Sequence, residues 1–329
     1  MNKRSIYKRN NKFMRSILER ECESKLLKYI GKRVLLAIVS ILIVSAITFF
    51  AMNAIPGGPF NKEKATDPAV QAELEARYNL DKPVPTQYVL YMGKLIHGDW
   101  GVSLKTGREI WPDITSKFAV SAKLGISAMI VATIFGIVLG SIAALTRNKW
   151  PDRLIVFFTT LGTAMPSFVL ATLLLLLFCL QLKWIPVYNS ANPNYVLPII
   201  ALSVYPMAYI TRLTKTSMLD ALNQDYVRTA KAKGVSRLKL IFVHALRNAL
   251  IPVITYLGPQ IAYILTGSMV IENIFTIGGL GSAFVTSITN RDYTTIMAVT
   301  IFLAILMVVA NLITDICYKL TDPRIDFNN

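Results

Sequence analysis

Residues 225–252 read DYVRTAKAKGVSRLKLIFVHALRNALIP. This is the longest polar stretch in the second half of the chain, and apolar runs long enough to cross a bilayer flank it on both sides. One interpretation is an ordinary basic loop between two membrane helices, because runs of charge are usually solvated. The alternative is a rigid element that docks a cytoplasmic partner. The remainder of the sequence distinguishes between these two interpretations.

Two short helices are predicted within this stretch. Asp225 is an N-cap type of residue, and good helix formers follow it over residues 226–233. Gly234 suits the left-handed position that ends many helices, and Ser236 suits the cap of a second helix that runs through Leu246. We therefore expect a compact pair of helices that meet at a glycine.

The composition points to a polytopic membrane protein. Of the 329 residues, 53% are hydrophobic and only 16% are charged, and the mean hydropathy is +0.48. Six segments contain no charged residue, and each is longer than the roughly 20 residues that a spanning helix needs. They are 34–61, 124–146, 154–182, 184–211, 248–271 and 293–314. The predicted fold class is an all-α integral membrane protein with six transmembrane helices. The alternative is five, with the proline-rich segment 184–211 re-entrant.

The net charge of +16 alternates from loop to loop along the chain. Residues 1–33 hold eleven Lys or Arg and three acids, and residues 211–247 hold eight Lys or Arg. The stretches 183–195 and 271–293 hold one each, Lys183 and Arg291. By the positive-inside rule, both termini and the quoted stretch lie in the cytoplasm. The basic character is thus a topology signal and not a sign of nucleic-acid binding.

The chain shows no means of doing chemistry. It has no Walker lysine motif, no Ser-His-Asp arrangement and no paired carboxylates in a plausible pocket. Its three cysteines are far apart, and its two histidines lack acids at ligand spacing, so no metal site is expected. We therefore predict that the chain is not an enzyme and carries no cofactor of its own. The remaining possibility is a passive pathway that a partner protein drives. The quoted stretch would then be the element that docks this partner.

A polar stripe marks the fifth predicted span. The stripe consists of polar residues at i, i+4 and i+7, namely Tyr256, Gln260 and Tyr263. Gly267, which has no side chain, makes the same segment narrower. A polar stripe inside a bilayer faces protein or water rather than lipid. The four residues are candidates to line a solute path, with hydrogen bonding between helices as the equal alternative.

The stretch also carries a resemblance. The run TAKAKG at 229–234, followed by an amphipathic helix, resembles the coupling motif of ABC-importer permeases. From about residue 30 onward, the chain resembles the first, B-type subunit of the oligopeptide/dipeptide permease family. The resembling pieces, in order, are IPGGPF at 55–60, LDKP at 80–83, GDWG at 98–101, MPSF at 165–168, QDYVRTAKAKG at 224–234, HALRN at 244–248, TGS at 266–268, GLG at 279–281, NRDY at 290–293 and DPRI at 322–325. LGP at 257–259 and TGSMVIE at 266–272 look more like the oligopeptide branch.

One departure limits what the resemblance carries over. The general ABC motif has Glu-Ala-Ala where this chain has Arg228-Thr229-Ala230, so a role for that glutamate cannot be assigned here. The resemblance also says nothing about the basic tail at residues 1–30. We expect that tail to be a cytoplasmic or interfacial segment.

The resemblance implies a type I ABC importer fold over residues 31–329, with an extracytoplasmic loop at 56–118 and a cytoplasmic coupling region at 217–247. The function implied is the transmembrane pathway of an ATP-driven oligopeptide importer in the cell membrane. Implied partners are a second homologous permease, two cytoplasmic ATPases that bind ATP and Mg²⁺, and an extracytoplasmic peptide-binding protein. The residues implied to couple to an ATPase are Asp225, Tyr226, Arg228, Thr229, Ala230, Lys231, Lys233, Gly234 and Val235.

Within that coupling helix, Tyr226 and Ala230 fall on one face at i, i+4, which predicts that they form the centre of the docking surface. Two other functions remain open. One is an ABC permease for dipeptides, nickel or another small solute. The other is a secondary, proton-coupled peptide carrier, although few ionisable groups lie within the predicted spans.

Overall fold

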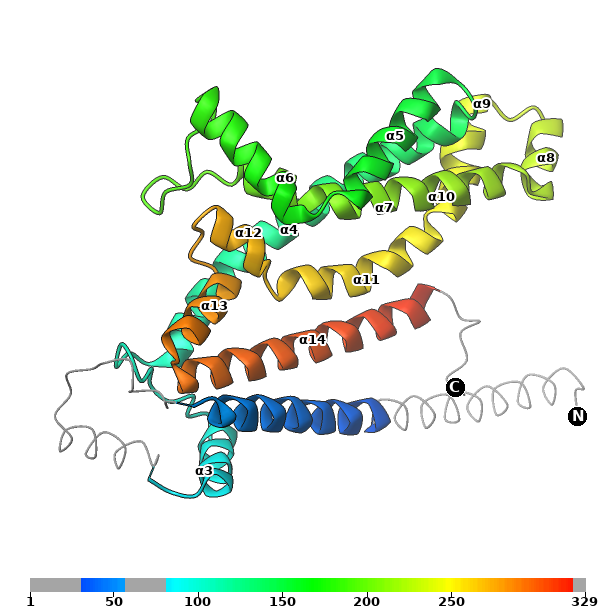
Figure 1. The fold of residues 1–329 in the computed structure, drawn as a ribbon. Coiled ribbons are helices and arrows are strands. Elements are labelled where there is room, and N and C mark those ends of the chain that lie inside the picture. Colours follow the sequence, from blue (N-terminus) through cyan, green and yellow to red (C-terminus); the bar gives the residue numbers. More distant parts are fainter. Residues whose placement is uncertain (1–30, 57–80, 322–329) are drawn as a thin grey trace, which may run out of the picture.

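The structure, a computed structural model, describes residues 31–56 and 81–321 (Figure 1). The regular structure of these residues is helical, and their only strand-like pairings are isolated bridges from Val102 to Glu109 and from Asn189 to Asn192. The tail at 1–30 and the motif at 322–325 lie outside the described residues. The all-α prediction is confirmed.

Within residues 31–56 and 81–321, four helices are long and apolar enough to cross a membrane. They are Gly31–Ala54, α4 (Ile110–Leu145), α7 (Val196–Leu222) and the first 23 residues of α14 (Tyr293–Thr321). The count reaches the predicted six if two bent helix pairs each form one span.

The first bent pair joins α5 (Trp150–Ala164) to α6 (Ser167–Leu174) and the π-helix η1 (Leu175–Gln181), with a bend of 104°. The break falls at Pro166, which has no N–H to continue the hydrogen-bond ladder. A proline inside a charge-free run predicts a kink, and the structure has one there, with the geometry of a near right-angled corner. The segment is thus a broken span or a re-entrant hairpin, whereas the sequence favoured 184–211 as the re-entrant candidate.

The second bent pair begins within the quoted stretch and continues beyond it. It joins three short pieces, α9 (Arg237–Lys239), η2 (Leu240–Ala245) and α10 (Leu246–Ala249), to α11 (Ile251–Leu265), with a bend of 46°. Pro252 lies in the first turn of α11, where a proline is tolerated. The remaining elements are α3 (Val84–Ile96), α8 (Asp225–Ala232), α12 (Met269–Ile274) and α13 (Leu280–Asn290).

Two helices are longer than the apolar pattern indicates. α4 begins at Ile110, well before the charge-free run at 124–146, so the last part of the expected outer loop is helical. α7 continues beyond residue 210 to Leu222. Its extension carries Lys215, which pairs with Asp152 on α5 and thereby holds a polar helical turn against the bundle.

The central contact is between α4 and α7, and small residues make it close. A Cβ atom added to Gly136 would lie 2.7 Å from the Ile210 side chain, and one added to Gly140 would lie 2.6 Å from the Thr211 carbonyl oxygen. Gly136 and Gly140 have the small-xxx-small spacing that predicts close helix packing, and the structure confirms it.

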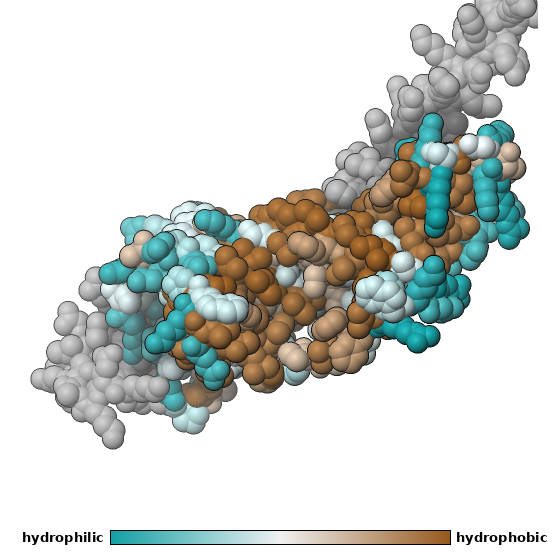
Figure 2. Space-filling model, turned by 90° about the horizontal axis from the view of Figure 1, so that it is seen from above, coloured by the Kyte–Doolittle hydropathy of each residue, from teal (hydrophilic) through white to brown (hydrophobic). Residues whose placement is uncertain are grey.

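The polar parts of the molecule gather at two opposite ends. α8 lies at one end, and α3 and α13 lie toward the other, with α11 packed beside α14 between them (Figure 1). The space-filling view shows an apolar middle with hydrophilic residues at both ends (Figure 2). This distribution suits a protein whose middle contacts hydrocarbon.

Candidate functional site

α8 forms the exposed tip of the quoted stretch. Gly234 follows it with a left-handed φ of +75°, and the Val235 N–H donates to the Ala230 carbonyl oxygen at 3.2 Å. The predicted helix end at Gly234 is confirmed. The N-cap residue, however, is Gln224, not Asp225. Asp225 already lies in the helix, where its carboxylate is 3.6 Å from the Arg228 guanidinium.

The two faces of α8 differ sharply. Val227 and Ala230 are buried, whereas Tyr226 is 40% exposed. The prediction that Tyr226 and Ala230 share an exposed docking face is wrong, because Ala230 packs inward and supports the helix. The exposed predicted coupling residues are Asp225, Tyr226, Arg228, Thr229, Lys231, Lys233 and Gly234, and Val235 is half-buried.

A small apolar cluster packs the segment that follows α8 against the helix bundle. Ile241, Ala245 and Ala249 pack against Met218 and Ala221 of α7. The second predicted helix is present, but it is broken into α9, η2 and α10, and Ser236 at its N-cap makes no side-chain hydrogen bond. α8 contacts η2, and the cluster joins η2 to α7, so packed side chains connect α8 to a spanning helix.

Tyrosine rings join α7 to α11 within the spans. Tyr209 and Tyr256 stack with ring centroids 4.4 Å apart and an interplanar angle of 26°. Tyr205, one turn earlier on α7, is 50% exposed, and Tyr209 is 43% exposed. Sequence reasoning singled out Tyr256 but missed both α7 residues, although their i, i+4 spacing in a charge-free segment is the same signal that marked the α11 stripe.

The predicted pathway residues do not all come together. Tyr256 and Gln260 are half-buried on α11, and Tyr263 is 66% exposed near its end. Gly267 lies beyond the end of α11, where its backbone packs against Glu272 and Gly281. Gly267 therefore belongs to a different cluster from Tyr256.

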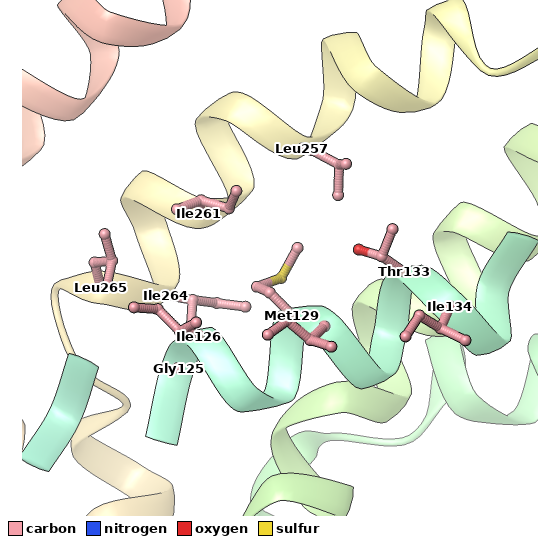
Figure 3. Close-up of a pocket in the computed structure, with 10 residues that line it drawn as sticks. Gly125, Ile126, Met129, Thr133, Ile134, Leu257, Ile261, Ile264 and Leu265 are labelled. Atoms are coloured by element: carbon pink, nitrogen blue, oxygen red, sulfur yellow. The ribbon is translucent and has the colours of Figure 1, made fainter. Parts of the chain in front are cut away.

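An apolar pocket of about 270 Å³ lies between α4 and α11. Figure 3 shows side chains of α11 facing α4 across it, among them Leu257 and Ile261 opposite Met129 and Thr133. Thr133 supplies its only lining hydroxyl. A peptide backbone placed there would leave polar groups unpaired, which is costly. We do not assign a peptide site to this pocket.

A buried carboxyl group lies near the end of the bundle opposite α8. Glu272 on α12 is fully buried, and it accepts hydrogen bonds from the Ser121 hydroxyl at 2.7 Å and from the Ser282 N–H at 2.9 Å. Burial raises the pKa of this carboxyl, while these donors and the N–H groups of Gly281 and Ser268 lower it, and the net direction is upward. No sequence motif pointed to it.

A second buried carboxyl holds the loop before α4. The Asp292 carboxylate accepts from the Ser103 hydroxyl at 2.5 Å, from the Leu104 N–H at 3.1 Å and from the Thr295 hydroxyl at 2.7 Å. The loop is thereby fixed to the start of α14. Among the described residues, no group of three or more His, Cys, Asp and Glu side chains is arranged to hold a metal ion.

Two family models match the chain. Residues 136–327 match the inner membrane component of binding-protein-dependent transport systems, and residues 26–125 match the N-terminal part of such components. The chain belongs to this family. It is therefore a multi-pass inner-membrane protein and a non-catalytic permease subunit, in which no cofactor is expected. The family's description also implies a binding protein and ATPase partners.

Relatives place the chain more closely within the family. The dipeptide transport system permease protein DppB of Bacillus subtilis is 47% identical over 91% of this chain and 97% of that protein. The oligopeptide transport system permease proteins OppB of Haemophilus influenzae and Salmonella typhimurium are each 42% identical over 92% of this chain and 100% of those proteins. The chain is thus a B-type permease of the oligopeptide/dipeptide family, as its motifs predict.

A solved structure supports the fold. The crystal structure of an amino acid ABC transporter with histidines matches 64% of this chain and 94% of that chain, with a TM-score of 0.52 and 14% identity. At this identity the likeness concerns the fold alone. It agrees with the predicted importer permease architecture.

Proposed function

We propose that the chain forms half of the membrane pathway of an ATP-driven oligopeptide importer. Its partners are a second homologous permease, two ATPase subunits and an extracytoplasmic peptide-binding protein. One observation carries the proposal: α8 is an exposed, basic helix mounted on spanning helices at one end of a chain of this family. Elsewhere, the described residues hold no chemistry that would drive transport.

The α8 end is assigned to the cytoplasm, together with both chain termini. The assignment rests on the basic residues of the stretch and on the charge asymmetry between loops. α3 and the loop held by Asp292 then lie outside, within the 56–118 segment that receives the binding protein. Residues 57–80 of that segment and the tail at 1–30 lie outside the described residues.

Energy enters at α8. Tyr226 is the aromatic centre of its exposed face and inserts into a groove of one ATPase subunit, while Arg228, Lys231 and Lys233 face acidic groups around that groove. Val227 and Ala230 hold the helix on the bundle from beneath. When ATP brings the two ATPases together, each pulls its docked helix and the bundle behind it.

Peptide passes along the tyrosine side of α7 and α11. Tyr205, Tyr209, Tyr256, Gln260 and Tyr263 line this route. Tyrosine rings pack against side chains of any sequence, and their hydroxyls bond to peptide backbone groups, so the surface suits varied peptides. Selection among peptides is left to the binding protein. Gly267 is assigned to the neighbouring cluster around Glu272.

The choice of oligopeptides rests on the motifs LGP at 257–259 and TGSMVIE at 266–272. Dipeptides are the second candidate substrate, and the identities favour them, since the relative named for dipeptides is 47% identical and those named for oligopeptides are 42% identical. Reconstituted complex in proteoliposomes, supplied with its binding protein, decides between them. We expect peptides of about four or five residues, which are longer than the dipeptide class, to stimulate the ATPase activity. Stimulation by dipeptides alone would favour the second candidate, and stimulation by Ni²⁺ alone would reject both.

A further inference from the structure

α13 begins without a cap of its own. Its N-cap residue is Gly279, which has no side chain, yet the first N–H groups of a helix need acceptors. Two other elements supply them. The Leu280 N–H donates to the Ser121 hydroxyl oxygen of α4 at 2.8 Å, and the Ser282 N–H donates to the Glu272 carboxyl of α12 at 2.9 Å.

Glu272 and Ser121 also bond to each other, because the Ser121 hydroxyl donates to the Glu272 carboxyl at 2.7 Å. Ser121 is therefore both an acceptor for α13 and a donor to α12. We call this three-element arrangement of Ser121, Glu272 and the first turn of α13 the clasp.

Three glycines enclose the clasp. A Cβ atom on Gly279 would lie 2.5 Å from both the Glu272 carboxyl oxygen and the Ser121 hydroxyl oxygen. A Cβ atom on Gly267 or Gly281 would lie 3.1 Å from a Glu272 carboxyl oxygen. Glycine at position 279 is thus explained by the space that the Glu272 carboxyl and the Ser121 hydroxyl occupy, whereas Gly267 also has a left-handed φ of +90° and Gly281 lies closest to the Met269 backbone.

The clasp lies where the hairpin of α12 and α13 joins the rest of the bundle. On one side Ile271, Phe275 and Ile277 pack against residues of α4, α6 and α7. On the other side Leu280 packs against Ile110 of α4 and Ala298 of α14. The chain reaches the hairpin directly from α11, so the clasp ties the far end of the tyrosine-bearing helix to α4.

We propose that Glu272 and Ser121 are positioning residues of the transport cycle, which hold the α12–α13 hairpin closed across the end of the pathway opposite α8. The inference rests on the proposed function. Outward opening parts α4 from the hairpin, so the Leu280 N–H and the Glu272 carboxyl each exchange Ser121 for water. The clasp therefore favours the closed state, and a binding protein must overcome it.

The test uses Ser121→Ala in the full complex, in a chain whose three native cysteines are replaced by alanine. The reporter is Ser282→Cys, a nearly isosteric change at a half-buried residue of the hairpin whose N–H is held by Glu272. The readout is the rate at which a membrane-impermeant maleimide labels the introduced thiol from outside, without binding protein. We expect Ser121→Ala to raise this rate about five-fold, the shift in the open population that one ordinary hydrogen bond supports. ATPase activity without binding protein should rise in parallel.

Ser287→Ala is the matched control. Ser287 is also a buried serine of the hairpin, but its hydroxyl donates within α13, to the Phe284 carbonyl oxygen. Ser121→Thr keeps the hydroxyl and should restore the parent rate. Equal labelling rates in Ser121→Ala, Ser287→Ala and the parent would overturn the clasp. If Ser121→Ala does not assemble, Glu272→Met, which removes the acceptor oxygens for Ser121 and Ser282, is measured in its place, with the same two outcomes.

The two proposals fail in different ways. Labelling of the reporter thiol needs neither ATP nor peptide, so it reports on the clasp even if transport is not observed. A parent complex without peptide-dependent ATPase activity would reject the proposed function. If the parent complex is active and Ser121→Ala leaves the labelling rate unchanged, only the clasp proposal would be rejected.

Discussion

Lys215 of α7 donates a hydrogen bond to the Asp152 carboxylate in the first turn of α5. Asp152 is buried, and its second oxygen accepts from the Asn148 N–H at 3.0 Å. The pair therefore joins α5 to the extension of α7 that leads into α8. The route from the docking helix to the broken α5–α6 segment runs through this contact.

Breaking the pair should weaken the complex. Asp152→Asn leaves a partly buried Lys215 without its partner, and we expect a loss on the order of 2 kcal/mol in the free energy of unfolding. Thermal unfolding of the purified complex measures it. Lys215→Met combined with Asp152→Asn should cost less than the sum of the two single changes, and strictly additive effects would argue against a coupled pair.

The contact between α4 and α7 leaves no room for a side chain at Gly140. A Cβ atom there would lie 2.6 Å from both the Thr211 carbonyl oxygen and the Thr214 Cβ atom. Gly140→Val should destabilise the complex by about 1–3 kcal/mol or prevent its assembly, because the helices must move apart. The matched control is Gly93→Ala in α3, where the added Cβ atom meets nothing within 4 Å. It should be neutral or slightly stabilising in the same thermal assay.

Substitutions at Gly234 test the effect of backbone strain in the absence of steric crowding. Its φ is +75°, but an added Cβ atom would meet nothing within 4 Å. Gly234→Val forces a β-branched residue into the left-handed region at a cost of about 1–2 kcal/mol, so the end of α8 should loosen. Gly234→Asn is tolerated there far better. We expect peptide-stimulated ATPase activity to fall in the valine variant and to persist in the asparagine variant. Equal activities would mean that this turn does not position α8.

Glu272 should make stability depend on pH. Burial raises the pKa of its carboxyl in the folded chain, whereas the unfolded chain titrates near the ordinary value of about 4.3. The folded state therefore prefers the protonated form. Its contribution to stability is fully present below about pH 4 and is lost as pH rises through the folded pKa.

The groups that donate to Glu272 are neutral: the Ser121 hydroxyl and the N–H groups of Ser268, Gly281 and Ser282. Glu272→Gln removes the titration. We expect the Tm of the parent, relative to that variant, to fall over the pH range above the ordinary carboxyl pKa of about 4.3. A relative Tm that rises over this range would contradict the direction of the shift.

The tyrosine route can be separated from the lipid-facing surface by labelling. Tyr209→Cys and Tyr256→Cys, made singly in the cysteine-free chain, should react with a water-soluble thiol reagent in at least one state of the transport cycle. Phe157→Cys is the control, because Phe157 is an exposed apolar residue of α5 and should face lipid. Protection of both tyrosine positions in every state would make their stacking purely structural.

The sequence predicted features that depend on one residue or on a regular period. Charge-free runs predicted the spans, Pro166 predicted a break, and Gly234 predicted the left-handed end of α8. Each follows from a local property: hydrophobic length, a missing N–H or the absence of a Cβ atom. The size of the bend at Pro166 did not follow, because a proline permits a corner while the packing of α6 against α7 and α12 sets its angle.

Features that join distant residues were not predictable in this way. Periodicity placed Tyr226 and Ala230 on neighbouring turns, but only the fold decides that Ala230 faces the bundle. Glu272 and Ser121 are 151 residues apart, and nothing in the local pattern of either one indicates the other. Tyr209 was missed because its meaning depends on Tyr256 of another helix.

The central claim is that ATP drives peptide through this chain by way of α8. The most direct test is uptake of labelled peptide into proteoliposomes that hold the whole complex, with the parent chain or with Tyr226→Ala. We expect parent uptake to require both ATP and the binding protein, and the variant to lose most of it while Tm stays unchanged, because Tyr226 is exposed. Uptake by this chain alone, driven by a proton gradient without ATP, would contradict the account.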